Sequence, residues 1–339
     1  MLPAMILRPK PLRDIAPSLP TGALMPAVTA VPAWLRTAAG QPEALEDVEF
    51  AAGAAIALLD AAVRRQEKWA GVWRQRLALS AAATVAKRSG RAEDEAALRD
   101  AVTLTRPGDD VGPAGRLLLA WRKFATRPVA SLLSDQALFA TAESFGWAPN
   151  DVVGEIAAAA RELSAGDDSP ATASAKMLDT VAGLLPEAER SLGPWLADAV
   201  LAQKLNWPVA VPLLGVHLVV TRPAAGRENG RRRPAVPALA GEGRKQQCRA
   251  GLARAAIQAI DLSVELSRRA ERLLTVAPTL RAKGSDAVIE RLLSEDAVVA
   301  SQEINGISDR GLRRLFDRLV DLGAVRELSG RSTFRIYGL

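Results

Sequence analysis

Apolar residues recur at intervals of three and four positions through most of residues 45–220, which is the spacing of one face of an α-helix. In residues 51–65, Ile56, Leu59 and Val63 follow this rule, and small residues between them allow a second helix to approach closely. Further helices are predicted over residues 71–88, 93–103, 117–123, 134–144, 150–163, 171–185 and 192–204. Helices of this length joined by short polar loops predict an all-helical domain.

The segment 308–323 carries its own start and stop signals for a helix. Ser308 is a favourable N-cap, Asp309 places a carboxylate at the positive end of the helix dipole, and Gly323 suits a left-handed stop. One arc of about 120° collects the apolar side chains Leu312, Leu315, Phe316, Leu319 and Leu322. The opposite side collects Arg310, Arg313, Arg314 and Arg318. One face is therefore predicted to be core, and the other to offer guanidinium groups.

Two shorter helical segments precede that helix. Residues 287–293 repeat apolar positions at helical spacing, and residues 298–304 are predicted to form a second helix. Asn305 and Gly306 follow directly and supply the tight turn needed between two helices set at a steep angle. This arrangement is typical of a helix-turn-helix.

A β-hairpin is predicted after the helix. Residues 324–328 and 333–337 are short runs of β-type composition, and residues 329–332 join them through a turn that contains glycine. Arg331 lies at the tip of this hairpin and Arg335 lies in its second strand. A hairpin of this make-up is typical of the wing of a winged helix-turn-helix.

Together these patterns predict a mainly α fold, in which a multi-helix bundle is followed by a C-terminal winged helix-turn-helix with a small β-hairpin wing. Residues 1–44 are rich in proline, so we expect a mostly disordered arm, with Trp34 and Leu35 as its docking residues. The helical domain, basic linker, connecting helix and winged helix are assigned to residues 45–220, 221–250, 251–283 and 284–339. An amphipathic helix over residues 252–276 forms most of the connection.

Positive charge is concentrated between the two predicted domains. The 339-residue chain has a net charge of +6, yet residues 222–283 alone carry +9, because 14 lysines and arginines face five acidic residues. The run Arg231, Arg232 and Arg233 lies within this segment. Basic runs bind polyanions by releasing counterions, although the same composition suits a solvated tether that has no partner.

Little in the sequence suggests catalysis or a metal site. Cys248 is the single cysteine, which excludes an internal disulfide and a multi-cysteine zinc site. His217 is the single histidine, and its apolar surroundings are typical of a core. The loop with Asp109 and Asp110 contains several glycines, but no Gly-Lys-Ser/Thr follows, so an interhelical loop is favoured over a ligand site. We therefore expect no enzymatic activity, no metal and no cofactor.

No feature of the sequence indicates export or a membrane. Arg8, Lys10 and Arg13 interrupt the first apolar residues, unlike the apolar core of a signal peptide. No apolar run reaches the roughly 18 residues that a membrane-spanning helix needs. We expect a cytoplasmic protein that does not contact a membrane.

Four stretches taken together resemble the family called domain of unknown function 1403: residues 69–79, 106–121, 195–202 and 312–339. The resemblance covers nearly the whole chain after the N-terminal arm. It implies an alphaproteobacterial protein, often carried on plasmids or other mobile elements, and it transfers no catalytic or binding residues. Residues 308–337 are also similar to the winged-helix tails of some Fic-type bacterial proteins. The Fic signature, which needs a histidine in a glycine-rich loop, is missing from the sequence, so that activity is not inferred.

The expected function is that of a DNA-binding regulator or accessory factor of a bacterial replicon or mobile element. The helix of residues 308–323 would lie in the major groove of duplex DNA, and Arg331 and Arg335 would reach the backbone or the minor groove. The linker arginines would add contacts to phosphates. The helical domain would hold a protein partner, a second copy of the chain or a small ligand. The alternative is an interaction adaptor, in which the winged helix binds a protein and no DNA.

Overall fold

The structure of the chain is a computed structural model. It describes residues 30–40, 45–106, 108–217, 227–228, 231–232, 242–280, 284–300, 304, 307–331 and 333–339. Most of the predicted N-terminal arm, and Arg233 of the basic linker, lie outside the described residues.

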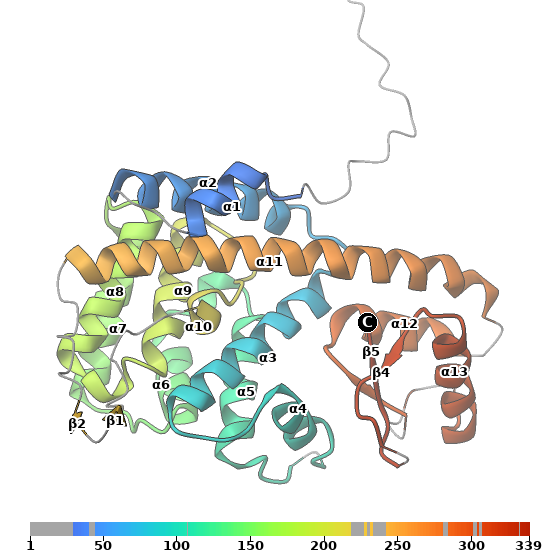
Figure 1. The fold of residues 1–339 in the computed structure, drawn as a ribbon. Coiled ribbons are helices and arrows are strands. Elements are labelled where there is room, and N and C mark those ends of the chain that lie inside the picture. The colour runs from blue at the N-terminus through green and yellow to red at the C-terminus, as the bar shows by residue number, and fades with distance from the viewer. Residues whose placement is uncertain are drawn as a thin grey trace, which may run out of the picture.

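Helices build most of the described chain, which confirms the prediction of a mainly α fold (Figure 1). The α-helices are α1 (Ala33–Gly40), α2 (Leu45–Arg64), α3 (Ala70–Arg88), α4 (Glu95–Thr103), α5 (Gly112–Phe124), α6 (Asp135–Ser144), α7 (Asp151–Ala165), α8 (Pro170–Leu184), α9 (Leu192–Lys204), α10 (Leu214–His217), α11 (Glu242–Val276), α12 (Ser285–Ser294) and α13 (Asp309–Asp321). Short 3-10 turns are η1 (Val129–Ser131), η2 (Pro186–Ala188) and η3 (Ala277–Thr279). The helices predicted in the bundle are all present, and α2, α5 and α11 begin earlier than predicted.

Side chains fix the starts of several helices. Asp94, Ser134, Asn150 and Ser169 each accept a hydrogen bond from the backbone N–H three positions later, at 2.8 to 3.3 Å. An N-cap of this kind satisfies one of the N–H groups that have no partner within the helix. The local sequence therefore determines where α4, α6, α7 and α8 begin.

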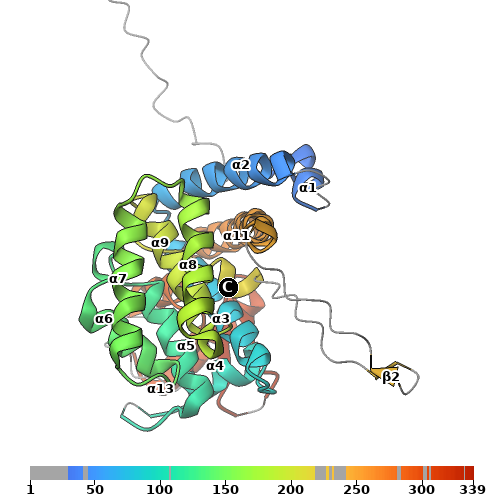
Figure 2. The ribbon, with the colours of Figure 1, turned by 90° about the vertical axis from the view of Figure 1, so that its left-hand side faces the viewer.

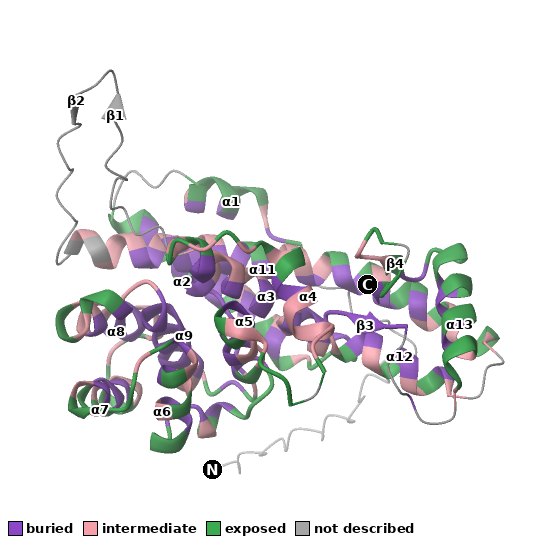
Figure 3. Ribbon diagram, turned by 90° about the horizontal axis from the view of Figure 1, so that it is seen from below, coloured by how far each residue is buried: buried purple, intermediate pink, exposed green. Residues whose placement is uncertain are grey.

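The 35-residue helix α11 is the central element of the fold. It packs along α2, α8 and α10 and continues to α12 and the C-terminal elements (Figures 1 and 2). Its buried side includes Leu252, Ile260, Leu266 and Leu273. A continuous cluster of buried apolar side chains extends from α1 to α13, so the two predicted domains share one core. Figure 3 shows these buried residues along the facing sides of the helices.

Tryptophans from two of the stretches that resemble the family lie in the middle of this core. Trp121 and Trp195 both contact Phe124 edge-on, with ring centroids 5.5 and 5.2 Å apart. A Cβ atom at Gly215 would lie 2.6 Å from the Trp121 ring, so glycine is needed where α10 crosses α5. The tryptophans of these two stretches therefore serve to pack the core of the bundle.

The buried carboxylate Asp198 holds α10 in place. Its oxygens accept hydrogen bonds from the backbone N–H groups of Leu213 and Leu214, at 2.8 and 2.9 Å. Burial disfavours the charged carboxylate and raises the pKa of Asp198 to about 7, although the backbone donors oppose this shift. Asp198 is thus a structural cap supplied from α9, a helix adjacent to α10.

A small antiparallel sheet lies among the C-terminal helices. Its strands are β3 (Val298–Val299), β4 (Arg326–Glu327) and β5 (Ile336–Gly338), in the order β3-β5-β4. Tyr337 pairs with Val298 on one side and with Glu327 on the other, and its ring stacks on Phe316 of α13 with a centroid distance of 4.3 Å. The sheet and α13 therefore pack as one unit. A separate antiparallel pair joins β1 (Arg227–Glu228) to β2 (Arg231–Arg232).

The helix predicted over residues 298–304 is wrong. Val298 and Val299 form strand β3, and Ile304 makes an isolated bridge with Ile307. Two adjacent β-branched residues fit a pleated strand better than a helix, and β5 supplies the partner that the local sequence could not reveal. The sequence pattern also placed Leu322 in the core, but this side chain is 43% exposed, because the helix ends beside it.

The N-terminal region also differs from its prediction. Residues 33–40 form α1, where Leu35 is fully buried and Trp34 is 52% exposed against Phe50 of α2. Arg36 donates to Asp261 of α11, with 2.7 Å between Nη1 and Oδ2. This end of the predicted arm is therefore helical and docked, with Leu35 as its buried anchor.

We expect the free energy of unfolding to fall as the pH rises from about 4 to about 7, because the folded chain keeps a proton on Asp198 that the unfolded chain releases. This contribution reaches about 4 kcal/mol, at about 1.4 kcal/mol for each pKa unit. Asp198→Asn resembles the protonated side chain, so urea unfolding of this variant should lose that part of the pH dependence. Asp167→Asn, which changes an exposed carboxylate, should keep it. If the free energy of unfolding of Asp198→Asn fell with pH as steeply as that of the wild type, Asp198 would not be the group that keeps the proton.

Candidate nucleic-acid interface

Helix α13 forms as its sequence predicts. Ser308 accepts a hydrogen bond from the Gly311 N–H at 3.2 Å, and Gly323 ends the helix with a φ of 63°, in the left-handed region. Leu312, Leu315, Phe316 and Leu319 are buried against the rest of the unit. The helix lies at the outer end of the molecule, and its outward side is exposed (Figures 1 and 3).

The four arginines predicted on this helix share its exposed side. Arg310, Arg313, Arg314 and Arg318 are all exposed. None of them makes a hydrogen bond or an ion pair with the part of the chain that the structure describes. The carboxylates Asp309, Asp317 and Asp321 are exposed on the same helix, so the surface combines free guanidinium groups with negative charge.

Two hollows flank the arginine side of α13. One, of about 370 Å³, lies between the helix and the hairpin and is lined by Arg313, Phe334 and Arg335. The other, of about 770 Å³, is lined by Arg314 and Arg318 together with η3. Both hollows thus lie directly beside exposed arginines of α13.

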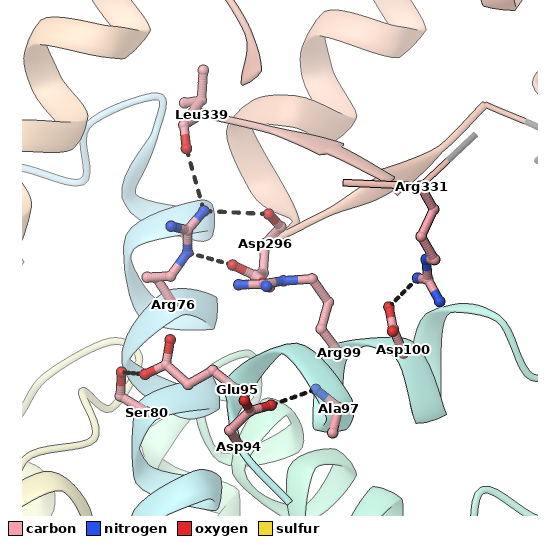
Figure 4. A network of polar contacts seen from close by, with 10 residues as sticks. All are labelled: Arg76, Ser80, Asp94, Glu95, Ala97, Arg99, Asp100, Asp296, Arg331 and Leu339. Atoms are coloured by element: carbon pink, nitrogen blue, oxygen red, sulfur yellow. Dashed lines mark hydrogen bonds and ion pairs between the residues drawn. The ribbon is translucent and has the colours of Figure 1, made fainter. Parts of the chain in front are cut away.

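Arg331 and Arg335, the two arginines predicted for the wing, make ion pairs, unlike the arginines of α13. Arg331 donates to Asp100 of α4 at 2.6 Å, a contact visible in Figure 4. Arg335 lies 3.8 Å from Asp317 and 3.9 Å from Glu327. Between them, Phe334 is 67% exposed and has a φ of 52°, an unfavourable backbone conformation for a bulky residue. The structure thus brings Arg335 next to α13 and ties Arg331 to the helical body.

The basic linker is attached far from α13. Arg231 and Arg232 belong to β2, but their side chains, like Arg233, lie outside the described residues. The chain re-enters the described structure at Glu242, the start of α11, whereas Arg272 near the other end of α11 reaches the Gly323 carbonyl of the C-terminal unit. Thirty residues of α-helix separate these two points, which corresponds to about 45 Å. The point where the linker joins α11 is therefore far from the α13 arginines in the described part of the chain.

A buried carboxylate holds the C-terminal unit against the helical body (Figure 4). Asp296, which precedes β3, is 1% exposed. The Nε–H of Arg76 from α3 donates to one of its oxygens, and the Nε–H of Arg99 from α4 donates to the other at 2.7 Å. Burial alone would raise the pKa of Asp296, but the charges and hydrogen bonds of Arg76 and Arg99 hold that pKa below its ordinary value.

The backbones around this ion cluster approach unusually closely. Arg76 also donates to the carbonyl of Leu339 at 3.3 Å. A Cβ atom at Gly71 would lie 2.7 Å from the Cα of Ser294, and one at Gly338 would lie 2.7 Å from the Asp296 carbonyl oxygen. Glycines are therefore required where α3 meets α12 and where β5 passes Asp296.

Sequence analysis did not identify this cluster. Asp296 follows a serine and a glutamate at the end of α12, where acidic residues are common, and its partners are about two hundred positions earlier. Arg76 lies within the helix predicted over residues 71–88, and nothing in the local sequence indicates its distant partner. Gly71 was the only available signal, because a glycine near the start of a strong helix often marks a close approach.

The remaining candidate groups lie apart from the arginine surface. The Asp110 side chain accepts the Gly112 N–H at 3.0 Å and lies 3.7 Å from Arg116, as expected of an interhelical loop. His217 contacts Gln258 of α11, and burial raises the pKa of the Cys248 thiol. Within the described residues, histidines, cysteines and carboxylates nowhere gather in threes as a metal site would need. Among the same residues, each helix is too short or too polar to cross a membrane.

Replacing Asp296 with asparagine should lower the free energy of unfolding by about 3–5 kcal/mol, because Arg76 and Arg99 would be left buried without a counterion. Asp135→Asn removes the carboxylate of an exposed pair with Arg161 and should cost no more than about 1 kcal/mol. Urea unfolding measures both values. In Asp296→Asn, hydrogen exchange should show that α12 and β3 lose protection first. Equal free energies of unfolding in the two variants would show that Asp296 does not hold the C-terminal unit against the helical body.

No protein of curated function matches the chain. The family model described as protein of unknown function DUF1403 matches residues 23–339, which includes the bundle, the Asp296 cluster and α13. The chain therefore belongs to the DUF1403 family.

Proposed function

We propose that this protein is a DNA-binding regulator or accessory factor of a bacterial replicon or mobile element, and that its C-terminal unit binds duplex DNA as a winged helix. The observation that carries the proposal is the exposed, unpaired state of four arginines on one side of α13. Guanidinium groups that are not committed to internal carboxylates are free to meet phosphates and guanine edges.

The topology of the C-terminal unit supports this proposal. A winged helix packs its third helix on a three-stranded antiparallel sheet whose last two strands form the wing. Helix α13 packs through Phe316 on Tyr337 of the central strand, and β4 and β5 are joined by the segment that contains Arg331. Such a module also has a second helix before the third, but Val298 and Val299 form β3 and Ile304 bridges Ile307, so the described residues between α12 and α13 contain no helix there.

The dimensions of α13 fit the major groove. Its 13 residues span about 20 Å, and the groove is about 12 Å wide. Arg310, Arg314 and Arg318 are spaced four residues apart and so follow one another along the exposed side, with Arg313 beside them. Each bidentate contact between an arginine and a guanine would contribute about 1–3 kcal/mol of discrimination.

The mixed charge on the exposed side of α13 determines the affinity for DNA that we expect. Asp309, Asp317 and Asp321 repel phosphates beside the same arginines, so binding through α13 should be moderate without further contacts. In this proposal the basic linker adds phosphate contacts that do not depend on sequence. Because its attachment is far from α13, it would act on a distant part of the same duplex.

A second candidate function is an interaction adaptor that binds protein through the same unit. The observation that favours it is the exposure of apolar side chains at the end of α13, where Val320 is 37% and Leu322 is 43% exposed. Exposed apolar residues of this kind, rimmed by charge, are common at protein interfaces. In that case salt would have a weak effect on binding.

The double variant Arg313→Ala/Arg314→Ala should bind a mixed-sequence duplex at least about tenfold more weakly than the wild type, because two charged hydrogen-bonding groups are lost. Fluorescence anisotropy with a labelled duplex, repeated at several salt concentrations, measures the affinity and its salt slope. The matched control Arg116→Ala/Arg161→Ala removes two exposed arginines of the bundle and should bind like the wild type. Equal affinity of the α13 variant and the control would exclude groove binding by α13.

Removing the linker charges should alter the salt dependence of DNA affinity. The variant Arg231→Ala/Arg232→Ala/Arg233→Ala should reduce the slope of log affinity against log salt by about 2 to 3, because each lost phosphate contact contributes about 0.9. Discrimination between duplex sequences should stay unchanged. The control variant Lys87→Ala/Arg116→Ala/Arg161→Ala changes net charge equally and should keep the wild-type slope. A slope that the linker variant leaves unaltered would mean that the linker is a tether only.

A further inference from the structure

A cleft of about 730 Å³ lies in the helical body, where α2, α8, α9 and α11 meet. Figures 1 and 2 show that α2, α8 and α9 lie toward the end of the molecule opposite α13. The volume is within the range of about 300–1,000 Å³ that small-molecule sites occupy. Its lining shares no residue with the arginine surface or with the Asp296 cluster.

One wall of the cleft is apolar and small. Helix α2 contributes Ala52, Gly53, Ile56 and Ala57, and α8 contributes Ala171. Gly53 has open space at its side-chain position, since an added Cβ atom would meet nothing within 4 Å. This wall offers apolar surface without polar partners, which suits a hydrocarbon or aromatic body.

The other wall is positively charged. Its centre is Arg249 of α11, whose side chain is only 10% exposed, and Arg64 and Lys204 also line the cleft. Arg249 donates to Thr172 Oγ1 at 3.3 Å and lies 3.1 Å from Glu49. Arg249 is thus held beside the cleft by one hydroxyl and one carboxylate.

The start of α8 adds to this positive field. Ser169 caps the helix, and Pro170 and Ala171 in its first turn line the cleft beside Arg249. A buried cation next to the positive end of a helix dipole is unfavourable unless negative charge lies nearby. The Glu49 side chain is 52% exposed, and Asp60 is already bound by Arg64 at 2.8 Å and by Trp207 at 2.9 Å. The carboxylate paired with Arg249 is therefore that of Glu49, which is half exposed and can be replaced by the carboxylate of a ligand.

We propose that this cleft binds a small organic acid, with its carboxylate on Arg249 and the first turn of α8 and its apolar body on the α2 wall. The planar guanidinium matches a carboxylate in geometry, and the N–H group of Ala171, in the first turn of α8, supplies a further donor. Glu49 is the group displaced toward solvent. Specificity comes from the pairing of one anionic head with an apolar body, because neither wall alone accommodates both.

Isothermal titration of the full chain with octanoate tests this site. The wild type should bind octanoate and should bind neither octanol nor inorganic phosphate with comparable affinity. Arg249→Gln should weaken octanoate binding at least about tenfold, because it removes a charged donor. Octanol that binds as tightly as octanoate, or a wild type that does not bind octanoate up to its solubility limit, would overturn the proposal.

A second variant separates loss of the site from loss of the fold, because Arg249 also contacts Thr172 and Glu49. Gly53→Leu fills the cleft from α2, and it replaces a helical glycine with a strong helix former, so its thermal stability should equal or exceed that of the wild type. Its affinity for octanoate should fall at least about tenfold. Gly154→Leu in α7, where an added Cβ atom also meets nothing within 4 Å, is the control and should bind like the wild type. Wild-type affinity in Gly53→Leu would place octanoate elsewhere and refute the proposed site.

Discussion

The contact between one buried carboxylate and two arginines determines how the two ends of this protein are arranged. Asp296 has almost no access to water, so its charge is stable there only because Arg76 and Arg99 approach both of its oxygens. Such a cluster tolerates little displacement, since each group would otherwise be buried alone. The strand β3 and helix α12 are thereby fixed to α3 and α4. The orientation of α13 relative to the bundle follows from this constraint.

Apolar packing supports the same arrangement over a larger area. The core continues from α1 to α13, and α11 contributes to it over most of its length. Gly71 lets α3 touch the backbone of α12, so the helical body and the C-terminal unit are in contact without an intervening layer of side chains. The C-terminal unit, attached in this way, shares one core with the bundle and presents the arginines of α13 on its exposed side. Any DNA that it bound would be held at a fixed angle to the bundle.

The parts of this structure that depend on local sequence could be predicted, and the parts that depend on distant partners could not. Helical periodicity and N-caps such as Ser308 and Asn150 identify the helices, and the exposed arginine side of α13 follows from the same periodicity. Strand β3 was missed because its partner β5 lies nearly forty residues later. The pairing of Arg331 with Asp100 was missed for the same reason, as was the Asp296 cluster. The cleft around Arg249 combines four distant segments, so no single stretch of sequence reveals it.

The continuity of α11 has a consequence for how the length of this protein can change. One residue inserted into an α-helix rotates everything beyond it by about 100° and advances it by about 1.5 Å. In α11 such an insertion would turn the face that meets α12 away from it while Arg249 stayed against α8, so both contacts could not be kept. An insertion or deletion within this helix therefore costs one of the two contacts, whereas a change in the length of a loop between other helices imposes no such rotation.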